Sequence, residues 1–491
     1  MILSIDQGTT GTTVLIINPG GEIIGRSYSE IKQLYPRPGW VSHDAENIWN
    51  SINKTILGAL SEANIRGSEI RSIGITNQRE TTLLWYKNTG NPLHEAIVWQ
   101  CTRTEKICSE LREKGFEKVV HEKTGLIISP YFSATKIIWL LKEIQKRNNL
   151  SYEQICFGTI DSYILYKLTG GNIHATDYTN ASRTMIFNIH DKQWDNDLLD
   201  YFDIPDDILP EVKPSSTIFG TTVDLDMLPA GIPITGIAGD QQSALFGHYG
   251  VHSGDIKNTY GTGCFTMLNT DQYPVHSNNG LITTLACDYL GKSSYALEGT
   301  VFNAGSSVQW LRDGLGIINS ARETESLAMS IPDTGGVYMV PAFNGLGSPH
   351  WDTNAKGLIV GITRGTEKKQ IVRAALESIA FQSADLIQAM LKDSNIEFNS
   401  LHVDGGASAN NFLMQFQADI LSMPIYRPLV LETTALGAAM LAGLTIGVWN
   451  QSDLENGFNP VDQTFEPNIS ADQREGMLAS WRDAINRSLS K

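Results

Sequence analysis

The sequence predicts an α/β protein built from two related domains. With 491 residues the chain is too long for one hydrophobic core. Buried-strand patterns are interspersed with stretches of helical spacing. A strand–turn–strand motif opens the chain and a similar one follows residue 254, which suggests an internal duplication. We expect domains at residues 1–245 and 246–491, with the ligand bound in a cleft between them.

The first domain begins with two strands joined by the turn DQGTT, residues 6–10. The turn signal NPGG at 18–21 leads into a third strand, and apolar residues at helical spacing predict a helix over 45–64. The apolar, β-branched stretch IRSIGIT at 70–76 predicts a buried strand. Three meandering strands, a helix and another strand form one α/β unit.

The second domain repeats much of this order. Residues 254–270 have the pattern of a strand, a glycine/threonine turn and a second strand, and residues 281–299 supply further strands around a turn. Helices are expected from residue 304 and over 369–391, and a strand is expected at 401–404.

The composition excludes several classes of protein. With 41% apolar and 18% charged residues the chain is typical of globular proteins, and its net charge of −16 argues against nucleic acid or an anionic membrane as a partner. Five cysteines without a C-x-x-C pair favour reduced thiols and a cytoplasmic location, and ten scattered histidines argue against a zinc site. No signal peptide is visible, because Asp6 interrupts the first apolar stretch. The apolar stretch at 435–449 is too short to span a bilayer and is expected to form a buried helix.

Three segments resemble phosphate-binding loops, and their contexts differ. ACDYLGKS at 286–293 is close to a Walker A loop, but both flanks are strand-like, so a hairpin turn is expected. YGTGCF at 260–265 lacks the third glycine of a dinucleotide fingerprint, and no helix follows it. In DQGTT and YGTG, however, a hairpin turn can direct backbone N–H groups and threonine hydroxyls at an anion without a lysine. A plain β-turn is the simpler interpretation of either alone, whereas the pair could hold a polyphosphate from two sides, with Asp6 binding Mg²⁺ through water.

Polar residues follow apolar strands at points where ligands bind in open α/β sheets. Arg79 and Glu80 come after IRSIGIT and either contact an uncharged, hydroxylated substrate or form a surface ion pair. Asp240 follows GIAG and opens an expected helix, as a general base or as an N-cap. In HVDGGASANN, Gly406 leaves the backbone bare for a ribose or a flat ring, and Asn410 either reaches that ligand or caps the next helix.

Six motifs occur in an order that resembles the FGGY family of carbohydrate kinases: DQGTT, GITNQRETT, IVWQC, GDQQSALFG, NTYGTGCF and DGGASANNFLMQFQADIL. YFSATKIIWLLKE and GLIVGITRGTEKKQIVRAALESIAFQ are similar to the two signature segments of that family. The resemblance extends from residue 6 to about residue 449. It implies a fold of the actin/Hsp70/hexokinase type, in which two RNase-H-like domains close on a cleft that holds ATP, Mg²⁺ and the substrate.

The resemblance also implies roles for residues at matching positions. Five side chains would hydrogen-bond the acceptor: Arg79, Glu80, Tyr131, Asp240 and Gln241. Asp240 would be the general base, and Trp99 and Phe265 would pack on the carbon backbone of the acceptor, although core packing is the default for Trp99 and Tyr131 taken alone. Eight residues would contact the nucleotide: Thr9, Thr10, Gly11, Thr262, Gly305, Gln309, Gly406 and Asn410. Asp6 would lie near the metal ion.

The segment NQRE at 77–80 is similar to the corresponding segment of the family members that phosphorylate glycerol. The expected reaction therefore converts glycerol and ATP into sn-glycerol 3-phosphate and ADP, with a pentose or another polyol as the alternative acceptor. A non-catalytic, ATP-dependent switch on the same fold is the alternative class, but it needs no base such as Asp240 and no polyol contacts such as Arg79 and Glu80. We also expect a homo-oligomer, a dimer or a tetramer, and no insertion into a membrane.

Three departures from the family pattern concern phosphate binding and regulation. Thr13 stands where relatives usually carry an arginine near the phosphates, so nucleotide affinity is expected to depend more on Mg²⁺. Residues 219–232 lack the Gly/Arg-rich loop through which some bacterial relatives bind fructose bisphosphate. No histidine lies between His190 and His248, so the phosphorylatable histidine of certain Gram-positive relatives is absent. Neither form of regulation is expected.

Overall fold

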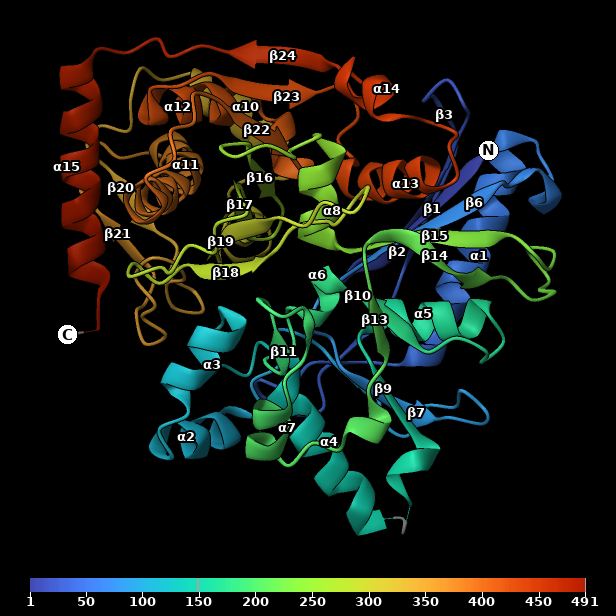
Figure 1. Cartoon of the computed structure of the whole chain (residues 1–491). Coiled ribbons are helices and arrows are strands. Elements are labelled where there is room, and N and C mark those ends of the chain that lie inside the picture. The colour runs from blue at the N-terminus through green and yellow to red at the C-terminus, as the bar shows by residue number, and fades with distance from the viewer. Residues whose placement is uncertain (148–149, 491) are drawn as a thin grey trace. The chain divides into compact units, whose positions relative to one another are not determined.

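The computed structural model describes residues 1–147 and 150–490, which form two compact units (Figure 1). Unit 1 and unit 2 are each built from three segments of the chain. Unit 1 comprises Met1–Tyr249, Thr283–Tyr295 and Thr433–Phe458, and unit 2 comprises Gly250–Ile282, Ala296–Glu432 and Asn459–Lys491. The domain boundary predicted at residue 245 stays a prediction.

A six-stranded sheet forms the centre of unit 1, in the order β14-β15-β6-β1-β2-β3. Its strands are β1 (Ile2–Gln7), β2 (Gly11–Ile17), β3 (Ile23–Glu30), β6 (Ser72–Asn77), β14 (Ser216–Thr221) and β15 (Pro233–Gly239). β1 is antiparallel to β2 and parallel to β6, and β15 continues in parallel beside β6. The three meandering strands, the helix and the buried strand predicted for the start of the chain are therefore confirmed.

Two helices cover opposite faces of this sheet. Leu3 and Ile5 share a hydrophobic core with Ile52 of α1 (Ala45–Ala63), whereas the Ser4 hydroxyl donates to the Ala435 carbonyl of α13 (Thr433–Thr445) at 2.5 Å. Successive strand residues point to opposite faces, so α1 and α13 lie on different sides of the sheet, as Figure 1 shows.

The helix α13 is the buried helix that the apolar stretch at 435–449 predicted. A Cβ atom at Gly74 of β6 would lie 2.2 Å from the Ala438 carbonyl oxygen, so α13 packs directly against the backbone of the sheet. It also contacts α8 (Asp240–Gly247). Within the two described ranges, no helix is long and apolar enough to cross a membrane.

The sheet of unit 2 has the order β18-β19-β17-β16-β22-β23-β24. Its strands are β16 (Ile256–Tyr260), β17 (Cys264–Asp271), β18 (Ile282–Leu285), β19 (Tyr295–Val301), β22 (Leu401–Asp404), β23 (Ile425–Pro428) and β24 (Val461–Phe465). β16 is antiparallel to β17 and parallel to β22, and β23 is parallel to β22 and antiparallel to β24. These relations match those of β2, β1, β6, β15 and β14 in unit 1, which supports the predicted duplication.

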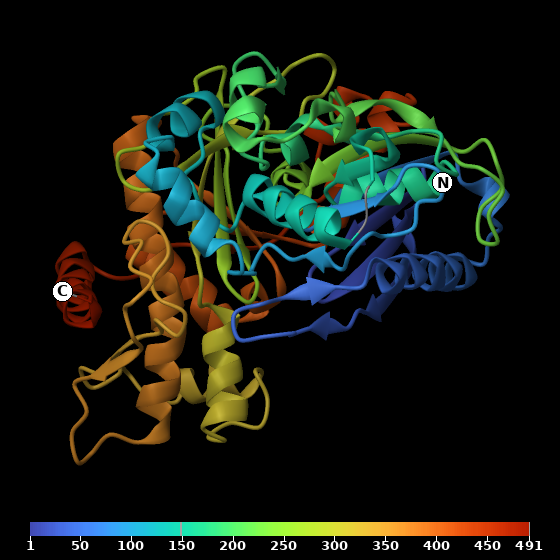
Figure 2. The same cartoon turned by 90° about the horizontal axis from the view of Figure 1, so that it is seen from below.

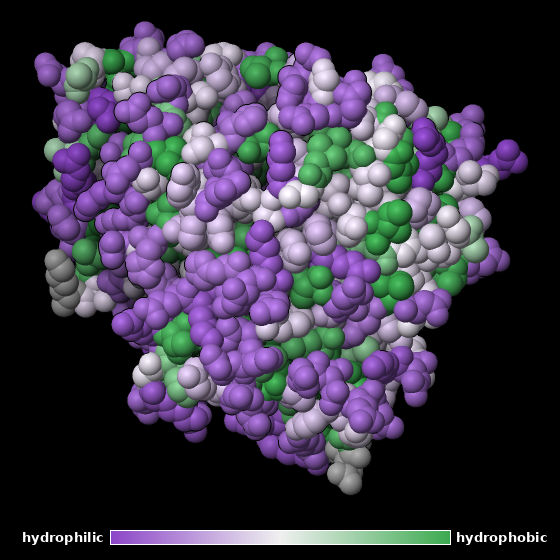
Figure 3. All heavy atoms as spheres, in the orientation of Figure 1, coloured by the Kyte–Doolittle hydropathy of each residue, from purple (hydrophilic) through white to green (hydrophobic). Residues whose placement is uncertain are grey.

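Helices complete unit 2. The helix expected from residue 304 is α9 (Gly305–Gln309), which passes into a π-helical turn at Trp310–Gly314. The helix expected over 369–391 is α11 (Lys368–Ser394), the long orange helix of Figure 2, and it packs against α10 (Glu323–Met329) and α12 (Asn411–Leu421). The face shown in Figure 3 is mostly hydrophilic, with scattered apolar residues.

Candidate active site

The two units carry equivalent hairpin turns. Between β1 and β2 the Gly8 amide donates to the Gly11 carbonyl at 2.9 Å, and between β16 and β17 the Gly261 amide donates to the Gly263 carbonyl at 2.9 Å. Thr10 and Thr262 lie exposed at the tips. A Cβ at Gly263 would approach the Val301 carbonyl oxygen to 2.3 Å, so close packing requires glycine there. Each turn thus presents hydroxyl and amide donors from a rigid base.

The segment that follows β6 places an ion pair between a buried arginine and a partly exposed aspartate at the end of the sheet of unit 1. The Arg79 side chain is 2% exposed, and its Nε lies 3.0 Å from Oδ1 of Asp240, the first residue of α8. Arg79 Nη1 also donates to Oε1 of Gln242 at 3.1 Å. The backbone N–H of Gln241 donates to the Asp240 carboxylate at 2.7 Å. Asp240 remains 28% exposed, so its carboxylate is oriented by the protein and accessible to a ligand.

Glu80 is only 1% exposed and has a φ of +59°. Its Oε1 accepts from Nε of Arg183 at 2.6 Å and lies 4.0 Å from Nε of Arg79. Positive φ is uncommon outside glycine and is found at functional sites, where surrounding contacts stabilise it. The surface ion pair that was left open for Arg79 and Glu80 is wrong, because both side chains are buried.

Two aromatic side chains lie beside this cluster. The rings of Trp99 and Tyr131 meet edge to face with centroids 5.6 Å apart, and the Arg183 guanidinium lies 5.7 Å from the Tyr131 ring. The Trp99 indole N–H donates to Oγ1 of Thr9 at 2.8 Å, which connects the aromatic pair to the β1–β2 turn. Unit 1 thus brings Trp99, Tyr131, Glu80 and the Arg79–Asp240 pair together. Phe265 belongs to β17 of unit 2.

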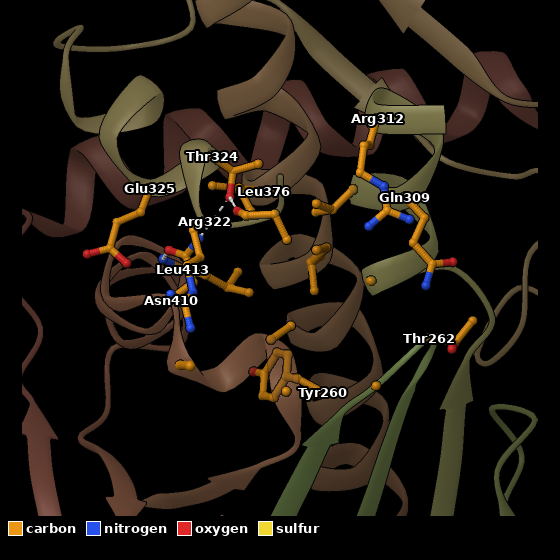
Figure 4. A pocket seen from close by; sticks show the side chains of 18 residues that line it. Tyr260, Thr262, Gln309, Arg312, Arg322, Thr324, Glu325, Leu376, Asn410 and Leu413 are labelled. Carbon is orange, nitrogen blue, oxygen red and sulfur yellow. Dashed lines mark hydrogen bonds between the residues drawn. The ribbon is translucent and has the colours of Figure 1, made fainter. Parts of the chain in front are cut away.

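A cavity of about 580 Å³ lies within unit 2 (Figure 4). Five residues predicted to contact the nucleotide line it: Thr262, Gly305, Gln309, Gly406 and Asn410. Figure 4 shows Gln309 and Arg312 on one side and Arg322 and Asn410 on the other. Asn410 caps α12 through a bond from the Leu413 amide at 3.0 Å and donates to Thr324 at 3.1 Å, so the predicted cap is confirmed. The volume suits a ligand of nucleoside size.

Several residues of these sites carry no motif in the sequence. Arg312, Arg322 and Thr324 line the cavity of unit 2, and Arg183 and Lys136 contact Glu80 in unit 1. The one available signal was a single basic residue within an otherwise uncharged stretch, as at Arg183 in ASRTMIF and Lys136 in SATKIIWL. A buried arginine or lysine needs partners, and these partners are distant in the sequence.

The Walker-like segment is a hairpin turn, as predicted. Tyr289 and Lys292 exchange two backbone hydrogen bonds, at 3.2 and 2.9 Å. The residues between them, Leu290 and Gly291, have φ of +52° and +72°, the pattern of a type I′ turn. Among the residues that the structure describes, no group of three or more His, Cys, Asp or Glu side chains could hold a metal ion. One carboxylate is nevertheless sufficient for Mg²⁺ that also binds phosphate and water.

Comparisons with known proteins agree with this architecture. The model of the N-terminal domain of the FGGY family of carbohydrate kinases matches residues 1–247, and the model of the C-terminal domain matches 256–446. "Glycerol kinase 2" of Thermotoga maritima is 52% identical and the glycerol kinase of Petrotoga mobilis 53% identical, each over 99% of this chain and 98% of its own.

Among solved structures, the glycerol kinase of Plasmodium falciparum with ADP has a TM-score of 0.91 at 36% identity, covering 100% of this chain and 98% of that one. A ligand-bound xylulose kinase of Lactobacillus acidophilus has a TM-score of 0.86 at 23% identity, covering 99% and 98%, which shows the fold alone. The predicted two-domain fold of the actin/Hsp70/hexokinase type is confirmed. With both domain models matched and close relatives spanning nearly its whole length, the chain belongs to the FGGY family of carbohydrate kinases.

Proposed function

We propose that this chain transfers the γ-phosphoryl group of ATP to glycerol and releases sn-glycerol 3-phosphate and ADP. The observation that carries the proposal is the Arg79–Asp240 pair, whose carboxylate is partly exposed, beside the buried Arg183–Glu80 pair. The two pairs present fixed donors and acceptors to an uncharged polyol. Relatives that share about half of its residues over nearly the whole length are named for glycerol.

The acceptor site follows from the cluster in unit 1. Five residues would hydrogen-bond glycerol: Arg79, Glu80, Tyr131, Asp240 and Gln241. Trp99, and Phe265 from the second domain, would pack on its carbon atoms. Arg79 holds the Asp240 carboxylate in one direction, and Asp240 would take the proton of the attacking hydroxyl as general base. Phosphoryl transfer depends mainly on positioning and on charge neutralisation, which suits so rigid a cluster.

The residues proposed to contact the nucleotide belong to both predicted domains, 1–245 and 246–491. Thr9, Thr10 and Gly11 of the first turn and Thr262 of the second would contact phosphate, and Gly305, Gln309, Gly406 and Asn410 would contact the nucleoside in the cavity of unit 2. Mg²⁺, when bound, neutralises phosphate charge, and Asp6 would hold it. Thr13 is the cross-strand partner of Asp6, so the arginine of relatives is replaced by an uncharged neighbour, which favours a cation beside Asp6.

We place this reaction in the cytoplasm, since the five cysteines are free thiols buried in the structure. The predicted homo-oligomer stays a prediction. An acceptor panel tests the function: ADP release is measured with glycerol, dihydroxyacetone, xylulose and no acceptor. We expect glycerol to give the highest kcat/KM. Equal ADP release without an acceptor would instead favour an ATP-dependent switch.

Asp240→Asn tests the base. The change keeps the shape of the side chain and removes its basicity, so kcat should fall by ~10²–10⁴-fold, the usual contribution of a general base. Nucleotide affinity, measured by calorimetry with ADP, should stay close to the wild-type value. The matched control is Asp472→Asn, an exposed aspartate in the first turn of α15 (Ala471–Ser488), which should leave kcat unchanged. An Asp240→Asn enzyme with wild-type kcat would remove Asp240 as the base.

A further inference from the structure

Lys136 is a fully buried cation next to the acceptor site. It lies in the first turn of α4 (Ser133–Arg147), where its side chain is 0% exposed. Its Nζ donates to three backbone carbonyls, those of Glu80 at 3.3 Å, Tyr131 at 2.5 Å and Phe132 at 3.3 Å. Glu80 and Tyr131 are among the residues proposed to contact the acceptor, and they lie 51 residues apart in the sequence.

The same turn of α4 holds the Glu80 peptide a second time. The Ser133 hydroxyl donates to the Glu80 carbonyl at 3.1 Å. Glu80 is thus fixed at both ends, its carbonyl by Ser133 and Lys136 and its carboxylate by Arg183. These contacts stabilise the positive φ of Glu80, which an unsupported glutamate would leave for a more common conformation.

A buried ammonium is costly, and its partners show what it does here. A protonated lysine has three N–H donors and no acceptor, and the three carbonyls match this number. Burying an ion without such bonds costs several kcal/mol, so an apolar residue would be the cheaper filler if packing were the only requirement. The ammonium instead draws two separate segments to one point.

We propose that Lys136 is a positioning residue that ties the Glu80 turn to the Tyr131 segment and thereby sets the affinity of the acceptor site for its polyol. The inference rests on the proposed function, since it takes Glu80 and Tyr131 to contact the acceptor. Lys136 itself acts only through the residues whose carbonyls it holds.

The protonation of Lys136 makes its link between the Glu80 turn and the Tyr131 segment depend on pH. Burial lowers the pKa of Lys136 to about 7, while Glu80, Cys101 and Cys108 act to raise it and Arg103 acts to lower it further. Above that pH the amine keeps only two N–H donors for three carbonyls. The acceptor site should therefore loosen as the pH rises from 7 to 9.

Lys136→Met is the main test, because it keeps an unbranched side chain only one atom shorter and removes the donors. Losing charge-assisted bonds to two segments should raise KM for the acceptor ~10–100-fold and leave KM for ATP within ~2-fold. The acceptor used in these assays is the substrate that the acceptor panel finds best. A preference for another polyol would therefore overturn the assignment of glycerol but not the positioning role of Lys136. Hydrogen exchange, measured without substrate, should be faster in residues 78–82 and 129–134.

Two further variants keep the test decisive if Lys136→Met does not fold. Lys136→Arg cannot lose its charge, so the rise of acceptor KM between pH 7 and 9 seen in the wild type should disappear. Ser133→Ala removes one donor from the Glu80 carbonyl and should raise acceptor KM ~3-fold. The matched control is Lys142→Met, an exposed lysine on the same helix, which should change neither KM nor exchange.

Two outcomes would overturn the proposed positioning role of Lys136. The first is a folded Lys136→Met enzyme with wild-type acceptor KM and wild-type exchange in both segments. The second is wild-type acceptor KM in Ser133→Ala together with the same pH profile in the wild type and in Lys136→Arg.

Discussion

At the scale of single residues, the Thr9 hydroxyl connects a residue of the proposed acceptor site to the proposed phosphate-binding turn. Its oxygen accepts the Trp99 indole N–H at 2.8 Å. A hydroxyl has one donor and two acceptor positions, so accepting from Trp99 leaves its own O–H free to donate to phosphate. Trp99 would thus pack on the acceptor with its ring and orient a phosphate ligand with its N–H.

Trp99→Phe separates these two roles. The change keeps an aromatic wall for the acceptor and removes the bond to Thr9. Because an ordinary hydrogen bond contributes about 1 kcal/mol, KM for ATP should rise ~2–10-fold while KM for glycerol changes less than ~2-fold. Steady-state kinetics measure both. Trp194→Phe is the control, since it loses an indole bond to the Pro210 carbonyl, 2.9 Å long, away from the site. Parallel increases in both KM values would contradict separate roles.

The site could be predicted from the sequence where its residues follow strands. Arg79, Glu80 and Asp240 come directly after β6 or β15, and the carboxyl ends of neighbouring parallel strands meet at one edge of the sheet. Lys136 and Arg183 could not be predicted, because their partner Glu80 lies 56 and 103 residues away and no local pattern encodes that contact.

At the scale of elements, local chemistry predicted the turns and the start of the helix near residue 304, but not its π-helical continuation. The I′ hairpin at Leu290 and Gly291 depends on residues that are neighbours in the chain. The helix from residue 304 becomes a π-helical turn after Gln309 and ends at Gly314, where glycine removes the propensity to continue. The strands against which α13 packs could not be predicted from the sequence either, because β1 and β6 lie hundreds of residues before it.

Gly437→Ala tests how closely α13 packs. A Cβ at Gly437 would lie 1.9 Å from the Ser243 carbonyl oxygen of α8, and backbone cannot move aside as a flexible side chain can. Alanine is the better helix former by ~1 kcal/mol, yet overpacking should destabilise the protein by ~1–3 kcal/mol. Gly476→Ala on α15 has no atom within 4 Å of the new Cβ and should stabilise slightly. Denaturant unfolding measures both, and stabilisation by Gly437→Ala would contradict the packing.

At the scale of the whole molecule, the two units repeat one arrangement and use it differently. Both have a hairpin turn on an antiparallel pair followed by two parallel strands. In unit 1 polar side chains fill the strand ends, whereas in unit 2 a cavity opens beside the turn. The sequence could predict the repeat from its two hairpins, but it could not predict that Thr433–Phe458 packs in unit 1, since that return depends on tertiary contacts alone.

A buried carboxyl network makes the stability of unit 1 depend on pH. Asp161 accepts from Thr159 at 2.5 Å and from Thr176 at 2.6 Å, and Asn77 at the end of β6 donates to it at 3.5 Å. Burial raises the pKa of Asp161 from 3.8 to about 7, and the carboxylate of Asp177 adds to the rise. Between these values the folded state holds a proton on Asp161 that the unfolded state releases. The contribution of Asp161 to the free energy of unfolding therefore falls as the pH rises from about 4 to 7 and is level above.

Asp161→Asn removes this titration. The difference in free energy of unfolding between the variant and the wild type should shift in favour of the variant by ~1–4 kcal/mol as the pH rises from 4 to 7. Above pH 7 this difference should stay constant. Calorimetric scans at several pH values measure it, and each kcal/mol corresponds to a shift in Tm of ~2–4 °C for units of this size. Asp200→Asn, at an exposed position on α7 (Asn196–Phe202), should keep the wild-type slope. If Asp161→Asn kept that slope as well, the proton would reside elsewhere in the network, with Asp177 as the next carboxyl to replace, since burial raises its pKa too.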